Sequence, residues 1–213
     1  MTQKENTLVE CLDGSASAGA EDAFRLVYAE VFAEPPYNET EDDVAATFRR
    51  FRSQTRKRTF RGVLARTGDG EPVGMAYGYP LGPRTRWWDQ LTRPVPDDMR
   101  REDGHRTFGL MEIAVRGPWR GHGTAGRLHA ALLAGTEAER VLLNVHPGSK
   151  AAQAAYRAWG YRKIGEARPW EGADLHDVML LDRTTEATAR PADDSEAGGR
   201  GEAGPERPRR RQS

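Results

Sequence analysis

The sequence contains a single cysteine, Cys11, in 213 residues, so a disulfide framework and a cysteine-based zinc cluster are both excluded. No run approaches the roughly 18 apolar residues that a membrane-spanning helix needs, and no apolar signal-peptide stretch opens the chain. Excess charge is also absent, because Lys+Arg and Asp+Glu both number 32, and this balance argues against a protein that coats nucleic acid. We expect a cytoplasmic protein with no membrane or nucleic-acid partner.

Aliphatic and aromatic residues are missing from the last part of the chain. Residues 184–213 include no Val, Ile, Leu, Met, Phe, Tyr or Trp, and their acidic residues balance their arginines. Such a segment cannot bury enough apolar surface to offset its loss of conformational entropy. We predict one folded domain over residues 1–183 and a disordered tail over residues 184–213.

Residues 1–183 alternate between strand and helix patterns. Short apolar runs predict seven strands, near residues 6–12, 59–67, 71–81, 108–115, 140–145, 161–167 and 175–182. Apolar residues at helical spacing predict four helices, near residues 20–33, 39–56, 123–137 and 149–160, the second of them capped by Thr40. A long polar loop is expected over residues 82–107. This order is that of a mixed α/β domain.

A glycine-rich turn joins the strand "LMEIAV" to the helix that follows it. Gly121 and Gly123 remove side chains from the turn, and Ala125 keeps it small. A helix N-terminus carries unpaired N–H groups and a positive dipole end, so an anion can approach these amides closely. The turn therefore predicts a site for a pyrophosphate, and four basic residues could add positive charge: Arg116, Arg120, Arg127 and Lys150.

Two common nucleotide motifs fit this turn poorly. The Gly-Lys-Ser/Thr end of a P-loop is missing. The text "GHGTAG" matches the glycine spacing of a dinucleotide fingerprint, but it lies in mid-chain, and no acidic residue ends the next strand "RVLLNV". Nicotinamide binding remains the weaker alternative.

The turn and the sequence after it match a longer pattern. Residues 120–125, "RGHGTA", fit Gln/Arg-x-x-Gly-x-Gly/Ala after a strand, and "VLLNVHPGSKAAQAAYRAWGYRKIG" adds a strand that ends near Asn, a helix with a Tyr, and a closing Gly-Tyr. Together these features resemble the GNAT superfamily of acetyl-CoA-dependent N-acyltransferases over residues 108–181. Upstream, "VFAEPPYNE" resembles the loop between the first two helices of some GNAT branches.

The resemblance implies a fold and a cofactor. The fold is a mixed, mostly antiparallel sheet of about seven strands, whose fourth and fifth strands splay apart, flanked by about four helices. Acetyl-CoA would lie in the gap, with its pantetheine arm along the fourth strand and its pyrophosphate on the glycine turn. The implied cofactor-binding residues are Ile113, Ala114, Val115, Arg120, Gly121, His122, Gly123, Thr124, Ala125, Gly126, Asn144 and Lys150.

The resemblance also implies direct attack of an amine on the thioester, without a covalent enzyme intermediate. Tyr156 corresponds to the family's acid; a phenol of pKa near 10 stays protonated at neutral pH and can donate to a thiolate. Glu112 is the only charged residue in "FGLMEIAV", and a carboxylate in such a run must be paired, exposed or functional. We interpret Glu112 as the base or a substrate contact, with a structural ion pair as the alternative.

Several polar residues keep a structural alternative. Asn144 could instead cap a turn, and His146 could be a base or a solvated loop residue. Cys11 is interpreted as a buried packing residue rather than a nucleophile. His122 and His129 have no partners at metal spacing, so we expect both to be exposed and predict no metal.

The acceptor is predicted to bind on the side opposite the cofactor, against the first two helices and the loop before the fourth strand. Tyr37, Trp87 and Trp88 are the candidate substrate residues, and only one of the adjacent tryptophans can face the site on an extended chain. We conclude that the sequence predicts an N-acetyltransferase for a small amine, as a monomer or homodimer. The alternatives are acetylation of a protein N-terminus or lysine, and a non-catalytic CoA-binding sensor.

Overall fold

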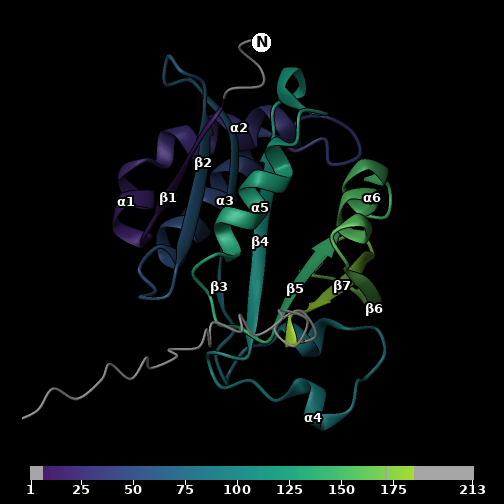
Figure 1. Cartoon of the computed structure of the whole chain (residues 1–213). Coiled ribbons are helices and arrows are strands. Elements are labelled where there is room, and N and C mark those ends of the chain that lie inside the picture. The colour runs from purple at the N-terminus through teal and green to yellow at the C-terminus, as the bar shows by residue number, and fades with distance from the viewer. Residues whose placement is uncertain (1–6, 171, 185–213) are drawn as a thin grey trace, which may run out of the picture.

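A seven-stranded sheet forms the centre of the computed structural model, which describes residues 7–170 and 172–184. The strand order is β1-β2-β3-β4-β5-β7-β6, and every neighbouring pair is antiparallel except β4 and β5, which are parallel (Figure 1). The strands are β1 (Leu8–Leu12), β2 (Arg61–Arg66), β3 (Pro72–Pro80), β4 (Thr107–Val115), β5 (Arg140–Val145), β6 (Arg162–Ala167) and β7 (His176–Asp182). All seven predicted strands are present. Apart from Thr184, the predicted tail lies outside the described residues.

Six α-helices occur in the described part of the chain, rather than about four. The four predicted ones are α2 (Glu21–Phe32), α3 (Glu41–Gln54), α5 (Thr124–Leu133) and α6 (Lys150–Ala158). The additional ones are short: α1 (Gly14–Gly19) and α4 (Asp97–Arg100), which lies in the predicted loop. Both helices are too short to show a helical spacing of apolar residues. In addition, α1, "GSASAG", contains glycine and serine, which favour helices only weakly. The predicted Thr40 cap is confirmed, because Thr40 and Asp43 form a reciprocal capping box.

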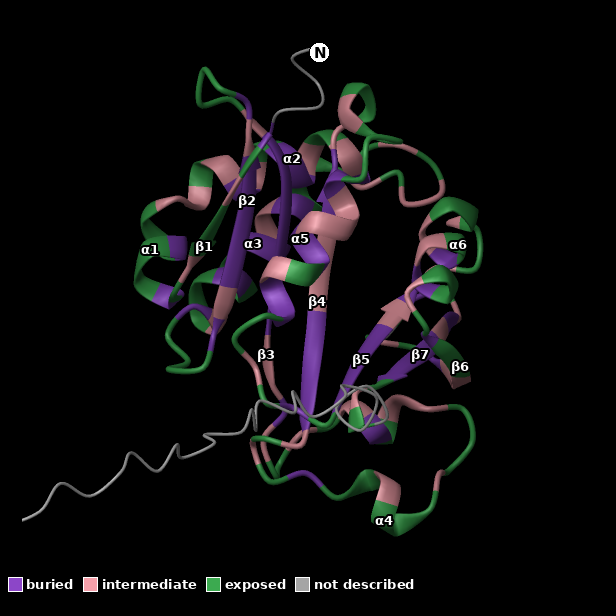
Figure 2. Cartoon of the chain, in the orientation of Figure 1, coloured by how far each residue is buried: buried purple, intermediate pink, exposed green. Residues whose placement is uncertain are grey.

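Both faces of the sheet are covered. Helices α2 and α3 pack on one face with an aromatic cluster that includes Phe24, Phe48 and Phe51. Helix α5 lies across β1–β4 on the opposite face, where Leu128 and Leu132 join a second cluster that also holds Tyr156 of α6 (Figures 1 and 2). Strands β3 and β4, largely purple in Figure 2, thus lie between two layers of helices, whereas β5 and β7 pack partly against the loop before β4.

The fourth and fifth strands part from each other, as predicted. They pair only at their start, where Thr107, Phe108 and Gly109 face Arg140, Val141 and Leu142. Beyond this point β4 continues to Val115 along β3, while β5 continues to Val145 along β7. Figure 1 shows the two arrows diverging toward the end at which α5 and α6 begin. The sheet therefore opens between these two strands.

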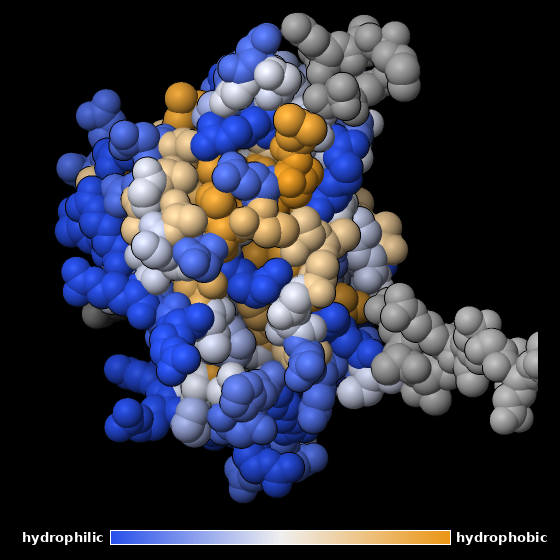
Figure 3. Space-filling model, turned by 60° about the vertical axis from the view of Figure 1, so that its left-hand side comes forward, coloured by the Kyte–Doolittle hydropathy of each residue, from blue (hydrophilic) through white to orange (hydrophobic). Residues whose placement is uncertain are grey.

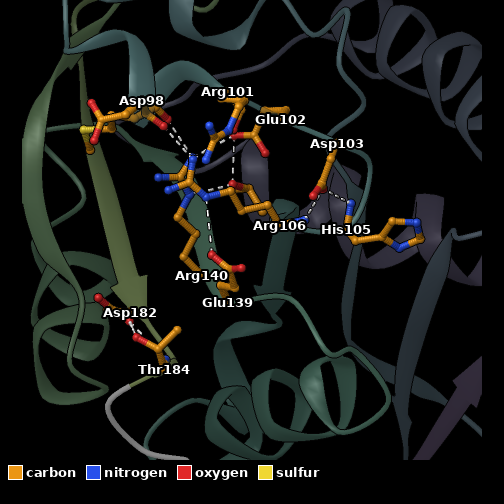
Figure 4. A network of polar contacts seen from close by, with 12 residues as sticks. Asp98, Arg101, Glu102, Asp103, His105, Arg106, Glu139, Arg140, Asp182 and Thr184 are labelled. Carbon is orange, nitrogen blue, oxygen red and sulfur yellow. Dashed lines mark hydrogen bonds and ion pairs between the residues drawn. The ribbon is translucent and has the colours of Figure 1, made fainter.

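The long loop before β4 is anchored at the start of the parted strands. The Glu102 carboxylate is buried and accepts hydrogen bonds from Trp88 Nε1 at 3.0 Å, Thr107 Oγ1 at 2.8 Å and Arg140 at 3.0 Å. Arg140 also lies over the Trp88 ring, 5.1 Å from its centre. Figure 4 shows Glu102 and Arg140 of this network beside Arg106, which donates to the carbonyl oxygen of Asp98. The loop is thus held by a buried network on Glu102 Oε1, while Glu102 Oε2 has no hydrogen-bond partner among the described residues.

One edge of the sheet is exposed. β1 forms this edge, and its residue Leu8 has 64% of its surface exposed. Figure 3 shows, on the side brought forward from the left of Figure 1, a hydrophobic patch surrounded by hydrophilic residues. Cys11 is exposed in the same strand, so the prediction of a buried packing cysteine is wrong. Its Sγ lies 3.8 Å from the carbonyl oxygen of Ala131 in α5, and the residue remains exposed because β1 is the edge of the sheet.

Candidate active site

The glycine turn has the backbone geometry of an anion site. Gly121 and Gly123 have φ values of 78° and 76°, in the left-handed region that favours glycine. A Cβ atom on either residue would meet no protein atom within 4 Å, so the space above the turn is open. Gly123 is the N-cap of α5 and supplies no side-chain oxygen to its first amides. These amides are therefore free to bind an anion.

The arginines around the turn are already paired with acidic residues. Arg116 pairs with Glu30 of α2 at 2.7 Å and also with Glu71, and it lies over the Trp119 ring. Arg120 pairs with Glu34 at 2.7 Å and donates to the Val115 carbonyl oxygen at 2.8 Å. Arg116 thus ties the turn to α2. The local charge is nearly balanced, and the main-chain amides are the better-placed groups for an anion.

The other implied cofactor residues lie around the turn and the parting strands. Arg127 donates to Thr7 and Thr124, whereas His122 and Lys150 are exposed. Residues 113–115 pair with β3 along one edge of β4, and their other edge faces the gap that opens toward β5.

Glu112 lies on β4 at the parting. It pairs with Tyr77 of β3, and paired residues of a sheet point to the same face, so its side chain lies on the face covered by α2 and α3. The register shifts directly after this pair, and Met111 forms a bulge. Burial and, to a lesser degree, the negative charge of Glu39 together raise the pKa of Glu112 to about 8, and Arg50 opposes the effect. At neutral pH most of the protein holds Glu112 protonated, and its ionised form is a stronger base than an ordinary carboxylate.

Glu39 was not among the predicted site residues. It lies in the loop between α2 and α3, and its Oε1 accepts a hydrogen bond of 2.9 Å from the Tyr28 hydroxyl. Tyr28 lies 3.3 Å from Thr47 Oγ1, to which Arg50 donates at 2.8 Å. Burial raises the pKa of Glu39. In the sequence, Glu39 reads as one more acid beside the first turn of a helix, so nothing there distinguishes it from Glu41 or Asp42.

Tyr156 approaches the same place from α6. The residue is 7% exposed and packs edge-on against Trp159 and at a tilt against Tyr161. Burial raises its pKa, and the charges of Tyr37 and Glu112 raise it further. Tyr156 therefore stays protonated at any physiological pH, and Tyr37 and Glu112 lie within its electrostatic reach.

An aromatic row crosses from the α2–α3 loop to the end of β5 and the β6–β7 loop. The Tyr37 ring lies 5.9 Å from His146, which lies 5.4 Å from His176, and Trp170 follows at 5.9 Å with 60% of its surface exposed. His146 accepts a hydrogen bond from the Gly148 amide through Nδ1, and its Nε2 lies 3.4 Å from Asp174. The candidate base His146 is thus already engaged on both ring nitrogens.

Two buried polar atoms near the parting have no hydrogen-bond partner among the described residues. They are Asn144 Oδ1 on β5 and Trp87 Nε1 in the loop before β4. A Cβ on Gly109, where β4 and β5 stop pairing, would lie 3.3 Å from the Trp87 ring. Unpaired buried polar groups are costly, so these atoms fit a role in ligand binding. Asn144 therefore fits the cofactor side and Trp87 the acceptor side.

One of the two candidate tryptophans is buried in the core, and the prediction that His129 is exposed is wrong. Residues 87–90 form a short 3₁₀ helix, in which Trp88 is buried in the core and Trp87 is only partly buried. His129 is buried rather than exposed: its Nε2 lies 2.9 Å from the Tyr161 hydroxyl and its ring stacks on Trp159. Burial lowers the pKa of His129 to about 4. His129 lies three and four residues before Leu132 and Leu133, so the helical period places it on the buried face of α5, a signal that the prediction did not use.

Hollows elsewhere on the surface do not coincide with Glu112. The larger, about 650 Å³, lies at the other end of the sheet and includes Leu12, Arg61 and Pro80 in its lining. Within residues 7–170 and 172–184, no group of three or more His, Cys, Asp or Glu residues is arranged to hold a metal ion. No helix of this described part is long and apolar enough to cross a membrane.

Comparison with known proteins decides the family. The model of the acetyltransferase (GNAT) family matches residues 24–161, more than half of the chain. This chain belongs to that family. It is therefore an N-acetyltransferase, and the resemblance read from the sequence is confirmed. No curated protein matches it.

Solved structures show the same fold at low sequence identity. A structure described as histone acetyltransferase HPA2 and related acetyltransferase from Corynebacterium glutamicum has 21% identity and a TM-score of 0.56, covering 83% of this chain and 96% of that one. The ribosomal-protein-S18-alanine N-acetyltransferase from Escherichia coli has 16% identity and a TM-score of 0.52, covering 83% and 94%. The NatC complex bound to Gag peptide and CoA has 14% identity and a TM-score of 0.54, covering 83% and 98%.

Proposed function

We propose that this acetyltransferase moves an acetyl group from acetyl-CoA to the amine of a small molecule, by direct attack in a ternary complex. The observation that carries the proposal is the place of Glu112 on β4 where it parts from β5, within electrostatic reach of Tyr156 on α6 and with the open glycine turn at the end of the same strand. One residue can accept a proton there and the other can donate one. This is the pair of proton transfers that acetylation of an amine requires.

The residues present fit acetyl-CoA. When bound, it supplies a thioester carbonyl that an amine can attack. The amides at the start of α5 would hold its pyrophosphate, and the free edge of residues 113–115 would pair with the pantetheine arm. The unpaired Asn144 Oδ1 would accept a hydrogen bond from one of the arm's amides.

Glu112 acts as the base. Amines reach the enzyme largely as ammonium ions, and only the neutral form is nucleophilic. With a pKa of about 8, Glu112 is closer in proton affinity to an amine than an ordinary carboxylate is, so it takes the proton at a smaller cost. Its position on the face of α2 and α3 assigns the acceptor to that side of the sheet.

Tyr156 acts as the acid. As the bond between nitrogen and the acetyl carbon forms, the bond between that carbon and sulfur breaks, and the departing thiolate needs a proton. The Tyr156 hydroxyl stays protonated because its pKa is raised by burial, and it has no hydrogen-bond partner among the described residues that would hold its proton. Tyr156 then recovers a proton from solvent, and Glu112 releases the one it took.

We infer the class of acceptor from the loop that covers the site. The loop before β4 is fixed by the Glu102–Arg140 pair and places Trp87 beside Gly109, on the acceptor side of the parting. A fixed aromatic cover suits a small molecule better than an extended peptide. The competing class is a protein acceptor, as in the names of two solved neighbours, the ribosomal-protein-S18-alanine N-acetyltransferase and the NatC complex with a Gag peptide.

The test is the release of CoA thiol from acetyl-CoA by the full chain. We expect release with small primary amines and much less with peptides that carry a free N-terminus or a lysine. Tyr156→Phe should reduce the rate by about 10²-fold and leave the acetyl-CoA dissociation constant nearly unchanged. Faster release with the peptides would favour the protein acceptor, and CoA binding without release for any amine would favour the sensor.

A further inference from the structure

Glu39 has a carboxylate oxygen that nothing in the described part of the chain binds. Its Oε1 accepts the Tyr28 hydroxyl at 2.9 Å, whereas its Oε2 is buried and has no hydrogen-bond partner. A buried, unpaired carboxylate oxygen is costly to keep, because its lost hydration is not replaced. Tyr28 in turn is fixed by Thr47, so the carboxylate is held with one oxygen engaged and the other available.

The Glu39 carboxylate forms no ion pair within the described part of the chain. Glu112 lies close enough for the Glu39 charge to raise its pKa. The same charge also raises the pKa values of the Tyr28, Tyr37 and Tyr77 hydroxyls. The cation that acts on both carboxyl groups is Arg50, an exposed residue whose guanidinium donates to Thr47. Neither carboxylate forms an ion pair with it. Because Glu112 is largely protonated at neutral pH, Glu39 carries the negative charge of the site, and Arg50 offsets that charge without a direct ion pair.

The reaction itself uses only one of the two carboxyl groups. The reacting ammonium gives its proton to Glu112, after which both the amine and Glu112 are neutral. Glu39 keeps its negative charge throughout. A second positive charge on the acceptor would therefore find a buried, preformed partner.

We propose that Glu39 binds a second cationic group of the acceptor, separate from the amine that is acetylated. This inference rests on the proposed function and narrows its substrate class to diamines and other amines that carry a second positive charge. The fixed Oε1 leaves Oε2 as the oxygen that receives the cation. Glu39 is then a binding residue that selects the acceptor, and Tyr28 is the residue that positions it.

The test is calorimetric titration of the full chain, saturated with CoA, with α,ω-diaminoalkanes and with monoaminoalkanes of the same length. We expect wild type to bind the best diamine about tenfold more tightly than its matched monoamine, the gain of one charged hydrogen bond. Glu39→Gln should abolish this preference. Glu41→Gln is the matched control, because Glu41 is an exposed acid two residues away, and it should retain the preference.

Two further readouts keep the outcomes distinct. Tyr28→Phe removes the positioning hydrogen bond but keeps the charge, so it should reduce the diamine preference without abolishing it. Equal binding of diamines and monoamines by wild type, or an unchanged preference in Glu39→Gln, would overturn the inference. Thiol release with monoamines and diamines alike would leave the proposed function standing while the inference fails. A diamine preference in binding without any thiol release would contradict the proposed function alone.

Discussion

The two sides of the parted strands offer different chemical groups for binding. On the cofactor side, the groups that can bind are main-chain amides, exposed by Gly121 and Gly123 in left-handed conformations. On the acceptor side, the working groups are ionisable side chains in partly or fully buried places: Glu39, Glu112 and Tyr156. Backbone amides bind a phosphate of any nucleotide, whereas buried charges select a particular partner. The proposed function thus pairs a general cofactor site with a specific acceptor site.

The difference predicts that substitutions on one side leave the other side's binding intact. Glu112→Gln should have the largest effect, because it removes the base while keeping size and hydrogen-bonding groups. We expect turnover to fall by about 10²–10⁴-fold at pH 7.5, with the acetyl-CoA dissociation constant changed less than about twofold. Steady-state thiol release and calorimetry measure the two quantities. Equal turnover in this variant and in wild type would remove Glu112 from the mechanism.

A substitution in the turn should do the opposite. Gly123→Val places a β-branched side chain in a left-handed conformation and in the open space above the turn, at a cost of at least about 1–2 kcal/mol. We expect acetyl-CoA to bind about tenfold more weakly. Gly68→Val is the matched control, since a Cβ there also meets open space but the backbone is not left-handed. If both variants bind acetyl-CoA as wild type does, the anion site lies elsewhere.

The smallest expected effect is on the pH dependence of folding stability, and it comes from Glu112 on the acceptor side. Because the folded pKa of Glu112 lies at about 8 and its ordinary value at 4.5, the folded state holds the extra proton between these values. Stability should therefore fall as pH rises through this window, by at most about 1.4 kcal/mol per pH unit. Glu112→Gln should remove this dependence.

Urea unfolding of both proteins between pH 6.5 and 8.5 measures the difference. In that range His129 contributes little, since its lowered pKa removes stability only as pH falls below 6.5. The groups that face Glu112 are Glu39, Arg50, Tyr28, Tyr77 and Tyr156, and the tyrosines remain uncharged there because their pKa values are raised. Parallel pH profiles for the two proteins would show that Glu112 has an ordinary pKa.

The same contrast explains which features of the fold and the site could be predicted from the sequence. Residues 119–133 contain the whole cofactor turn in one continuous stretch, and the seven strands, the four longer helices and the parting of β4 and β5 follow from local patterns and from the family resemblance. The acceptor side brings together the α2–α3 loop, β4 and α6, so Glu39 becomes visible only in three dimensions. Burial of His129 could have been predicted, because it shares the helical period of Leu132 and Leu133. Exposure of Cys11 could not, because it depends on β1 being the edge of the sheet.

The most direct test of the account is calorimetric titration of the purified full chain with acetyl-CoA, with NADH as the control ligand. The account predicts binding of acetyl-CoA in the micromolar range and no binding of NADH, because the uncapped amides of α5 sit beside strands parted for a pantetheine arm. Binding of NADH, or the absence of acetyl-CoA binding, would contradict it.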